Sequence, residues 1–113
     1  MTVELPVLPG PAAARCGPPA VGIDATLDAE RIAVVAKALA EPLRVRILDV
    51  LSRSAEPVCQ CELIALFDMG QSLLSHHIRK LVAADLVEVE RRHKWAYYSV
   101  SPDAFEVLSA WLS

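Results

Sequence analysis

The stretch Val58–Leu81, which reads VCQCELIALFDMGQSLLSHHIRKL, decides how this chain folds. It contains two segments with helical patterning, separated by the short break Asp68-Met69-Gly70. A Cys-x-Cys pair opens the first segment, and the outer face of the second carries Ser, His, Arg and Lys side chains. Two short helices joined by a tight turn are typical of a helix-turn-helix, a unit whose second helix can lie on DNA.

The composition fits one ordinary domain. The chain has 113 residues, of which 54% are hydrophobic, so it can bury a core and still leave apolar surface for an oligomer. The net charge is −3 and the sequence pI is about 5.5, so only local basic patches could bind nucleic acid. The opening MTVELPVLPGP does not resemble a signal peptide, and no apolar run reaches membrane-spanning length. We therefore expect a cytoplasmic protein with reduced thiols and no membrane contact.

Outside the central stretch, the chain divides into an arm and a domain. Residues 1–25 hold five of the eight prolines and predict an extended N-terminal arm, with the folded domain over residues 26–113. Apolar residues at helical spacing predict four helices in the domain, over Asp28–Leu39, Pro42–Arg53, Cys59–Phe67 and Gln71–Ala83.

The pattern changes to period two from Leu86 onward. It predicts one strand in which Val87 and Val89 alternate with Glu88 and Glu90, a polar turn over Arg91–Lys94, and a second strand over Ala96–Val100. A fifth helix is predicted to start at Pro102. The expected fold is mainly α with a β-hairpin, a winged helix-turn-helix in the order ααααββα.

The second helix of the helix-turn-helix has two distinct faces. On a helical wheel Leu74, Ile78 and Leu81 share one side, which must face the core. His76 points outward, whereas His77 falls near the core edge and is expected to pack. The polar face and the basic hairpin tip form a candidate DNA-contacting surface. Its members are Gln71, Ser72, Ser75, His76, Arg79, Lys80, Arg91, Arg92 and Lys94. The alternative, a set of ordinary solvated charges, leaves the pairing of a helix-turn-helix with a basic wing unexplained.

The cysteines are candidate ligands for a soft ion. In an ideal helix Cys59 and Cys61 would point about 200° apart, so they can share an ion only if the helix start is irregular or distorts. A helix N-terminus is also expected to lower a thiol pKa. Cys16, carried by the arm, could supply a third thiolate. Three sulfur ligands suit trivalent arsenic or antimony, whereas zinc and similar ions usually take a fourth ligand. The alternative for each single cysteine is a small apolar residue.

Four strings resemble the ArsR/SmtB family of metal-sensing repressors over about residues 27–112. They are ALAEPLRVRIL (38–48), VCQCEL (58–63), QSLLSHHIRKL (71–81) and WAYYSV (95–100). The resemblance implies a winged helix-turn-helix homodimer that binds an inverted-repeat operator and leaves it when the inducer binds. It also implies that Cys59 and Cys61 are the inducer ligands of an arsenite-responsive member, with Cys16 as a further ligand.

Two departures from the family pattern bear on the site. The family's reading helix opens Ser-Gln-Pro-Thr, whereas this one reads Gly70-Gln71-Ser72-Leu73, so an apolar residue replaces a polar one at Leu73. The last predicted helix has Asp103 and Glu106 but no His, which argues against a zinc site there.

The expected function is an As(III)- or Sb(III)-responsive transcriptional repressor without an organic cofactor. A cadmium, lead or zinc sensor and a redox sensor of the same fold stay open, as does a winged-helix protein-interaction module that does not bind DNA. We do not expect an enzyme, because the sequence has no nucleophile–base pair, Gly-rich phosphate loop or paired-carboxylate motif.

Overall fold

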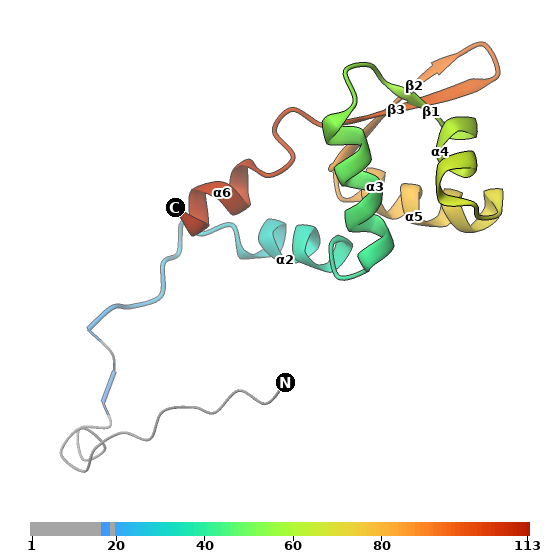
Figure 1. Ribbon diagram of the computed structural model, residues 1–113. Helices are drawn as coiled ribbons and strands as arrows, with labels where there is room; N and C mark the ends of the chain where they lie inside the picture. Colours follow the sequence, from blue (N-terminus) through green and yellow to red (C-terminus); the bar gives the residue numbers. More distant parts are fainter. Residues whose placement is uncertain (1–16, 19) are drawn as a thin grey trace.

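The computed structural model describes residues 17–18 and 20–113, so Cys16 and most of the predicted arm lie outside the described residues. Figure 1 shows a bundle of helices with a small twisted sheet at one end, and α6 beside α2 at the other. The helices are α2 (Ala29–Ala38), α3 (Pro42–Arg53), α4 (Gln60–Phe67), α5 (Gln71–Ala83) and α6 (Glu106–Leu112). The strands are β1 (Val58–Cys59), β2 (Val87–Arg92) and β3 (Trp95–Val100).

Local signals explain where the first two of these helices begin. The Asp28 carboxylate accepts the backbone N–H of Arg31 at 3.1 Å and caps α2. Pro42 occupies the first turn of α3, where its fixed φ and missing N–H cost nothing. The predicted bounds of α3 are confirmed, and those of α2 differ by one residue at each end.

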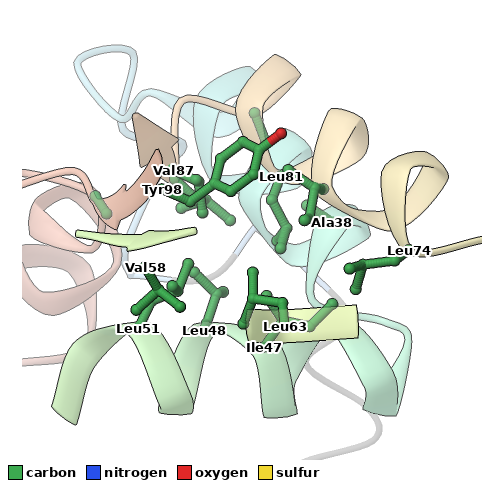
Figure 2. Close-up of a cluster of buried hydrophobic side chains, with 14 of the residues drawn as sticks. Ala38, Ile47, Leu48, Leu51, Val58, Leu63, Leu74, Leu81, Val87 and Tyr98 are labelled. Atoms are coloured by element: carbon green, nitrogen blue, oxygen red, sulfur yellow. The ribbon is translucent and has the colours of Figure 1, made fainter. Parts of the chain in front are cut away.

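The hydrophobic core lies between α3, α4, α5 and the sheet. In Figure 2, side chains of α3 point toward Leu81 of α5 and Tyr98 of β3. Burial of each large aliphatic side chain contributes about 1.5–3 kcal/mol to folding. The predicted inward faces of α3 and α5 are confirmed, because their members are all buried: Ile47, Leu48, Leu51, Leu74, Ile78 and Leu81.

The sheet has three antiparallel strands in the order β1-β3-β2. The sequence did not predict β1, which has only two residues and no periodicity of its own. Val58 pairs with Tyr98 and Cys59 pairs with Tyr97. The prediction that Cys59 starts a helix is therefore wrong, since Cys59 ends a strand and precedes the helix by one residue.

The wing is the hairpin of β2 and β3. The predicted turn over Arg91–Lys94 is too long, because Arg91 pairs with Ala96 and Arg92 pairs with Trp95. The turn itself consists of two residues, and its first, His93, has a positive φ of 57°. Two-residue hairpin turns need positive φ, and this backbone geometry lets the strands continue through the arginines.

The last helix begins later than predicted. Residues 102–105 form turns rather than the first turn of the helix, and the buried Ala104 donates its N–H to the Ser101 carbonyl at 3.1 Å. The helix then packs on α2. Its apolar residues include Trp111 and Leu112, whose exposed fractions are 53% and 73%. In the described part of the chain, every helix is too short or too polar to span a bilayer.

Candidate functional site

Cys59 and Cys61 come together at the start of α4. Cys59 is the N-cap of this helix and has extended backbone angles, φ −68° and ψ 143°. Because Cys59 lies outside the helical turn, the separation of about 200° that an ideal helix would impose on the two side chains does not apply. The two Sγ atoms are 2.9 Å apart. The irregular helix start that shared ligation requires is thus part of the fold.

The two thiols have different surroundings. Cys59 is only 4% exposed, and its backbone N–H donates to Oε1 of Glu62 at 3.4 Å. Cys61 is exposed to solvent. The sheet and the core therefore hold Cys59 in place, while Cys61 is open to an incoming ligand.

The pKa of the Cys61 thiol is raised above its ordinary value. The main cause is the hydrogen bond that Cys61 donates to the Cys59 sulfur, and desolvation and the charges of Cys59 and Glu62 act in the same direction. The prediction that the helix N-terminus lowers the thiol pKa is therefore wrong for Cys61. A backbone hydrogen bond at Glu62 lowers this pKa, but the hydrogen bond to the neighbouring sulfur is the larger effect.

The third predicted ligand, Cys16, lies outside the described residues. Among residues 17–18 and 20–113, no group of three or more His, Cys, Asp or Glu side chains could hold a metal ion. The pair of Cys59 and Cys61 thus offers two soft donors, and a three-sulfur site would draw its third donor from Cys16.

Helix α5 presents its polar face to solvent. Ser72, His76 and Arg79 are exposed, as the helical wheel predicted. His77 is half-buried, and burial, followed by the charge of Arg44, lowers its pKa. Its Nδ1 atom is buried and has no hydrogen-bond partner. The predicted difference between the two histidines is confirmed.

The wing adds three exposed basic residues, Arg91, Arg92 and Lys94. Of these three, Arg92 forms an ion pair within the part of the chain that the structure describes, since its Nη2 lies 3.0 Å from Oε2 of Glu90. Its guanidinium carbon also lies 4.7 Å from the centroid of the Tyr97 ring. Arg91 and Lys94 therefore carry the uncompensated charge of the wing.

A cleft of about 360 Å³ lies between the start of α4, the outer face of α5 and the sheet. We call it the reading cleft, and its lining residues are Gln60, Gln71, Ser72, Ser75, Arg79, Arg91 and Tyr98. More than half of the predicted DNA-contacting residues line it. Cys61 lines a neighbouring hollow of about 370 Å³ together with Arg91 and Lys94, so this thiol lies beside the basic residues of the wing. Lys80 lies elsewhere, in a hollow with Val34 and Arg44.

Two residues of the site, Gln60 and Tyr98, were not predicted from the sequence. The Gln60 side-chain amide donates from Nε2 to Oγ of Ser75 at 2.7 Å, which joins α4 to α5. Its position between two candidate ligands could have drawn attention to Gln60 in the sequence. The hydrogen bond to Ser75 could not be predicted, because it depends on how α4 packs on α5. Tyr98 lines the reading cleft from β3, and burial raises the pKa of its hydroxyl.

A helix-turn-helix followed by a two-stranded basic wing defines the class of winged helix-turn-helix proteins. The sequence profile described as "Bacterial regulatory protein, arsR family" matches residues 41–89. The chain belongs to the ArsR family, a class of regulators rather than enzymes. The resemblance seen in the sequence is therefore confirmed.

Three curated relatives show how far the similarity extends. The chain is 34% identical over 67 residues to the arsenical resistance operon repressor of Bacillus subtilis, covering 59% of this chain and 63% of the relative. It is 31% identical over 72 residues to the Staphylococcus aureus protein of the same name, covering 64% and 67%. It is 32% identical over 72 residues to the cadmium resistance transcriptional regulatory protein CadC homolog of S. aureus, covering 64% and 59%. The chain thus spans about three fifths to two thirds of these relatives' length.

Solved structures share the fold. The chain is similar to a crystal structure of an ArsR family transcriptional regulator, with a TM-score of 0.66 and 28% identity over 74% of this chain and 84% of that one. It is also similar to a homodimeric winged helix-turn-helix DNA-binding domain from Mycobacterium bovis, with a TM-score of 0.62 and 25% identity over 74% and 77% of the two chains.

Proposed function

We propose that this chain is a transcriptional repressor that binds operator DNA as a homodimer and is released when As(III) or Sb(III) binds its cysteine thiolates. The observation that carries the proposal is the 2.9 Å approach of two sulfur atoms in a helix start that packs on the candidate reading helix. Membership of the ArsR family and relatives named for arsenical resistance support it.

The DNA-binding part of the proposal rests on α5 and the wing. Helix α5 enters the major groove, where the exposed Ser72 and Arg79 reach base edges or phosphates. Arg91 and Lys94 hold the backbone beside it. The acidic net charge does not oppose this, because basic side chains are concentrated locally: Arg79 and Arg91 line the reading cleft, and Lys94 lines the neighbouring hollow.

The inducer part rests on the chemistry of sulfur. Two thiolates favour a thiophilic ion over a hard cation, and Cys16 is proposed as the third ligand. Trivalent arsenic and antimony take three sulfur donors, which matches the number of cysteines in the chain. Ligation of Cys61 also places the inducer beside Arg91 and Lys94, in the surface proposed to hold DNA.

The dimer part rests on exposed apolar side chains at the α2–α6 end of the molecule. Val34 of α2 is 46% exposed, and Trp111 and Leu112 of α6 are still more exposed. A second copy of the chain would bury them, and the two reading helices would then bind half-sites of an inverted repeat about one helical turn apart.

The direct test is a titration of arsenite into the protein–DNA complex. The operator is first selected from random duplexes with the full-length protein, and DNA affinity is then measured with and without arsenite at fixed salt. We expect arsenite to weaken DNA binding roughly 5–150-fold, the usual size of allosteric coupling. Mg²⁺, a hard cation that prefers oxygen ligands, is the matched control and should leave the affinity unchanged. Unchanged DNA affinity at saturating arsenite would refute the proposal.

A cadmium-responsive repressor is the second candidate, because one relative is named for cadmium resistance. Separate titrations of the protein–DNA complex with Cd²⁺ and with arsenite rank the two inducers by how much each weakens DNA binding. X-ray absorption of the loaded protein then gives the sulfur number, with three sulfurs expected for arsenic and a fourth ligand for cadmium. Release by peroxide alone, without any ion, would favour a disulfide-based redox sensor instead.

A further inference from the structure

Gln60 connects the thiol pair to the reading helix. It is the first residue of α4 and stands between Cys59 and Cys61 in the sequence. Its Nε2 donates to Oγ of Ser75, 2.7 Å away in α5. Among the side-chain hydrogen bonds of the described residues, this bond alone joins α4 to α5.

The direction of this bond sets what Ser75 can do. A serine hydroxyl has one proton to donate and two lone pairs to accept with. Because the Gln60 amide donates to the oxygen, the hydroxyl proton of Ser75 stays free for another acceptor. Ser75 lines the reading cleft together with Ser72 and Arg79, where a DNA phosphate oxygen would be that acceptor. Gln60 thus holds Ser75 ready to donate to DNA.

Binding an ion between the thiols must disturb this arrangement. Two sulfur atoms bound to one ion at about 2.3 Å each stand roughly 3.3–3.8 Å apart, so the present 2.9 Å separation has to widen. Cys59 is 4% exposed and its backbone is paired with Tyr97, so it resists movement. Cys61 is exposed. The shift therefore falls on the first turn of α4, which is the turn that carries Gln60.

We propose that Gln60 is the positioning residue that couples thiol occupancy to DNA binding. Its hydrogen bond to Ser75 is present in the DNA-binding form and breaks when an ion draws on Cys59 and Cys61. Loss of the bond frees the Ser75 hydroxyl to turn away from the phosphate. This inference rests on the proposed function, because it assigns the route between the two sites of that function.

The test compares the full-length wild-type protein with Gln60→Leu, which keeps the size of the side chain but removes its hydrogen bond. Two quantities are measured: arsenite affinity, from the ultraviolet absorption of the arsenic–sulfur bonds, and the release factor, which is the ratio of DNA affinities without and with arsenite. We expect Gln60→Leu to bind arsenite at least as tightly as the wild type, because the ion no longer has to break this hydrogen bond. Its release factor should fall from the roughly 5–150-fold range to below about 3-fold.

Ser54→Ala is the matched control, since it removes another 2.7 Å side-chain hydrogen bond, from Oγ of Ser54 to the Val50 carbonyl, at a residue outside the reading cleft and the thiol pair. Its release factor should stay at the wild-type value. Linkage adds a consistency check, because DNA must lower arsenite affinity by the same factor by which arsenite lowers DNA affinity. The two factors must agree in every variant, so a disagreement between them identifies an error in one of the titrations.

A second variant covers the case in which Gln60→Leu folds poorly. In Gln60→Glu the carboxylate can only accept, so it takes the Ser75 proton away from DNA. We expect weak DNA binding without arsenite and little further loss with it. If arsenite releases the wild type, and a folded Gln60 variant has the same release factor as the wild type, the role of Gln60 is overturned while the proposed function stands. If arsenite fails to release the wild type, the proposed function itself is wrong.

Discussion

The structure predicts that the two cysteines of the thiol pair can be removed with equal loss of function and unequal loss of stability. Cys59 is 4% exposed and packs at the edge of the core, whereas Cys61 is exposed. Cys59→Ala removes one buried heavy atom, which costs about 1 kcal/mol, comparable to a buried methylene. For a domain of this size that corresponds to a fall in Tm of roughly 4–8 °C. Cys61→Ser changes an exposed atom and should stay within about 0.5 kcal/mol of the wild type.

Both variants should lose the response to arsenite, because each leaves one sulfur of the pair without its partner. The assay is thermal unfolding followed by circular dichroism at one fixed protein concentration, since dimerisation makes Tm depend on concentration. Arsenite titration of the DNA complex follows on the same samples. Equal destabilisation by the two variants would contradict the observed burial of Cys59. A wild-type arsenite response in either variant would contradict a shared site at the start of α4.

Three further predictions concern DNA binding, pH and assembly. Arg79→Ala should weaken DNA binding, and loss of one phosphate contact there would make the slope of log affinity against log salt concentration shallower by about 0.9. Arg92→Ala should weaken DNA binding less, because Glu90 already pairs with that arginine. Equal effects of the two variants in a salt-dependent shift assay would contradict this prediction. Burial lowers the folded-state pKa of His77 below its ordinary value of 6.5, so its contribution to stability is present above pH 6.5 and is lost as the pH falls through the folded pKa. Denaturant unfolding between pH 7.5 and 5 should show this loss in the wild type and a smaller one in His77→Gln. Trp111→Ala should shift the protein toward monomer in sedimentation analysis, and an unchanged oligomeric state would place the interface elsewhere.

Much of the fold could be predicted from local patterns. Leu74, Ile78 and Leu81 recur at helical spacing, and all three are buried as expected. Pro42 marks the start of α3 because proline is compatible only with the first turn of a helix. The alternation around Val87 and Val89 indicated the first wing strand, although Val89 itself is 41% exposed.

The predictions that were wrong concern residues whose conformation is set by segments distant in the sequence. Cys59 belongs to β1 because β3 pairs with it, and a two-residue strand leaves no periodic trace. The arginines of the wing remain in β2 because the hairpin turn has only two residues. The first of them, His93, has a positive φ, a conformation that a glycine in the sequence would have indicated. The late start of α6 follows from Ala104, which is buried in the turn before that helix.

The order of the helices and the wing, and the inward faces of α3 and α5, could be predicted from the sequence alone, and the sequence also supplied the candidate side chains for a soft ion or DNA. These properties follow from residue type and short-range periodicity, which act within a few residues of chain. The tertiary structure brings the Cys59 and Cys61 sulfurs together, forms the hydrogen bond between Gln60 and Ser75, and places Cys61 beside Arg91 and Lys94. Each of these contacts depends on how β1 pairs with β3 or how α4 packs on α5, and such pairings join segments that no local pattern connects.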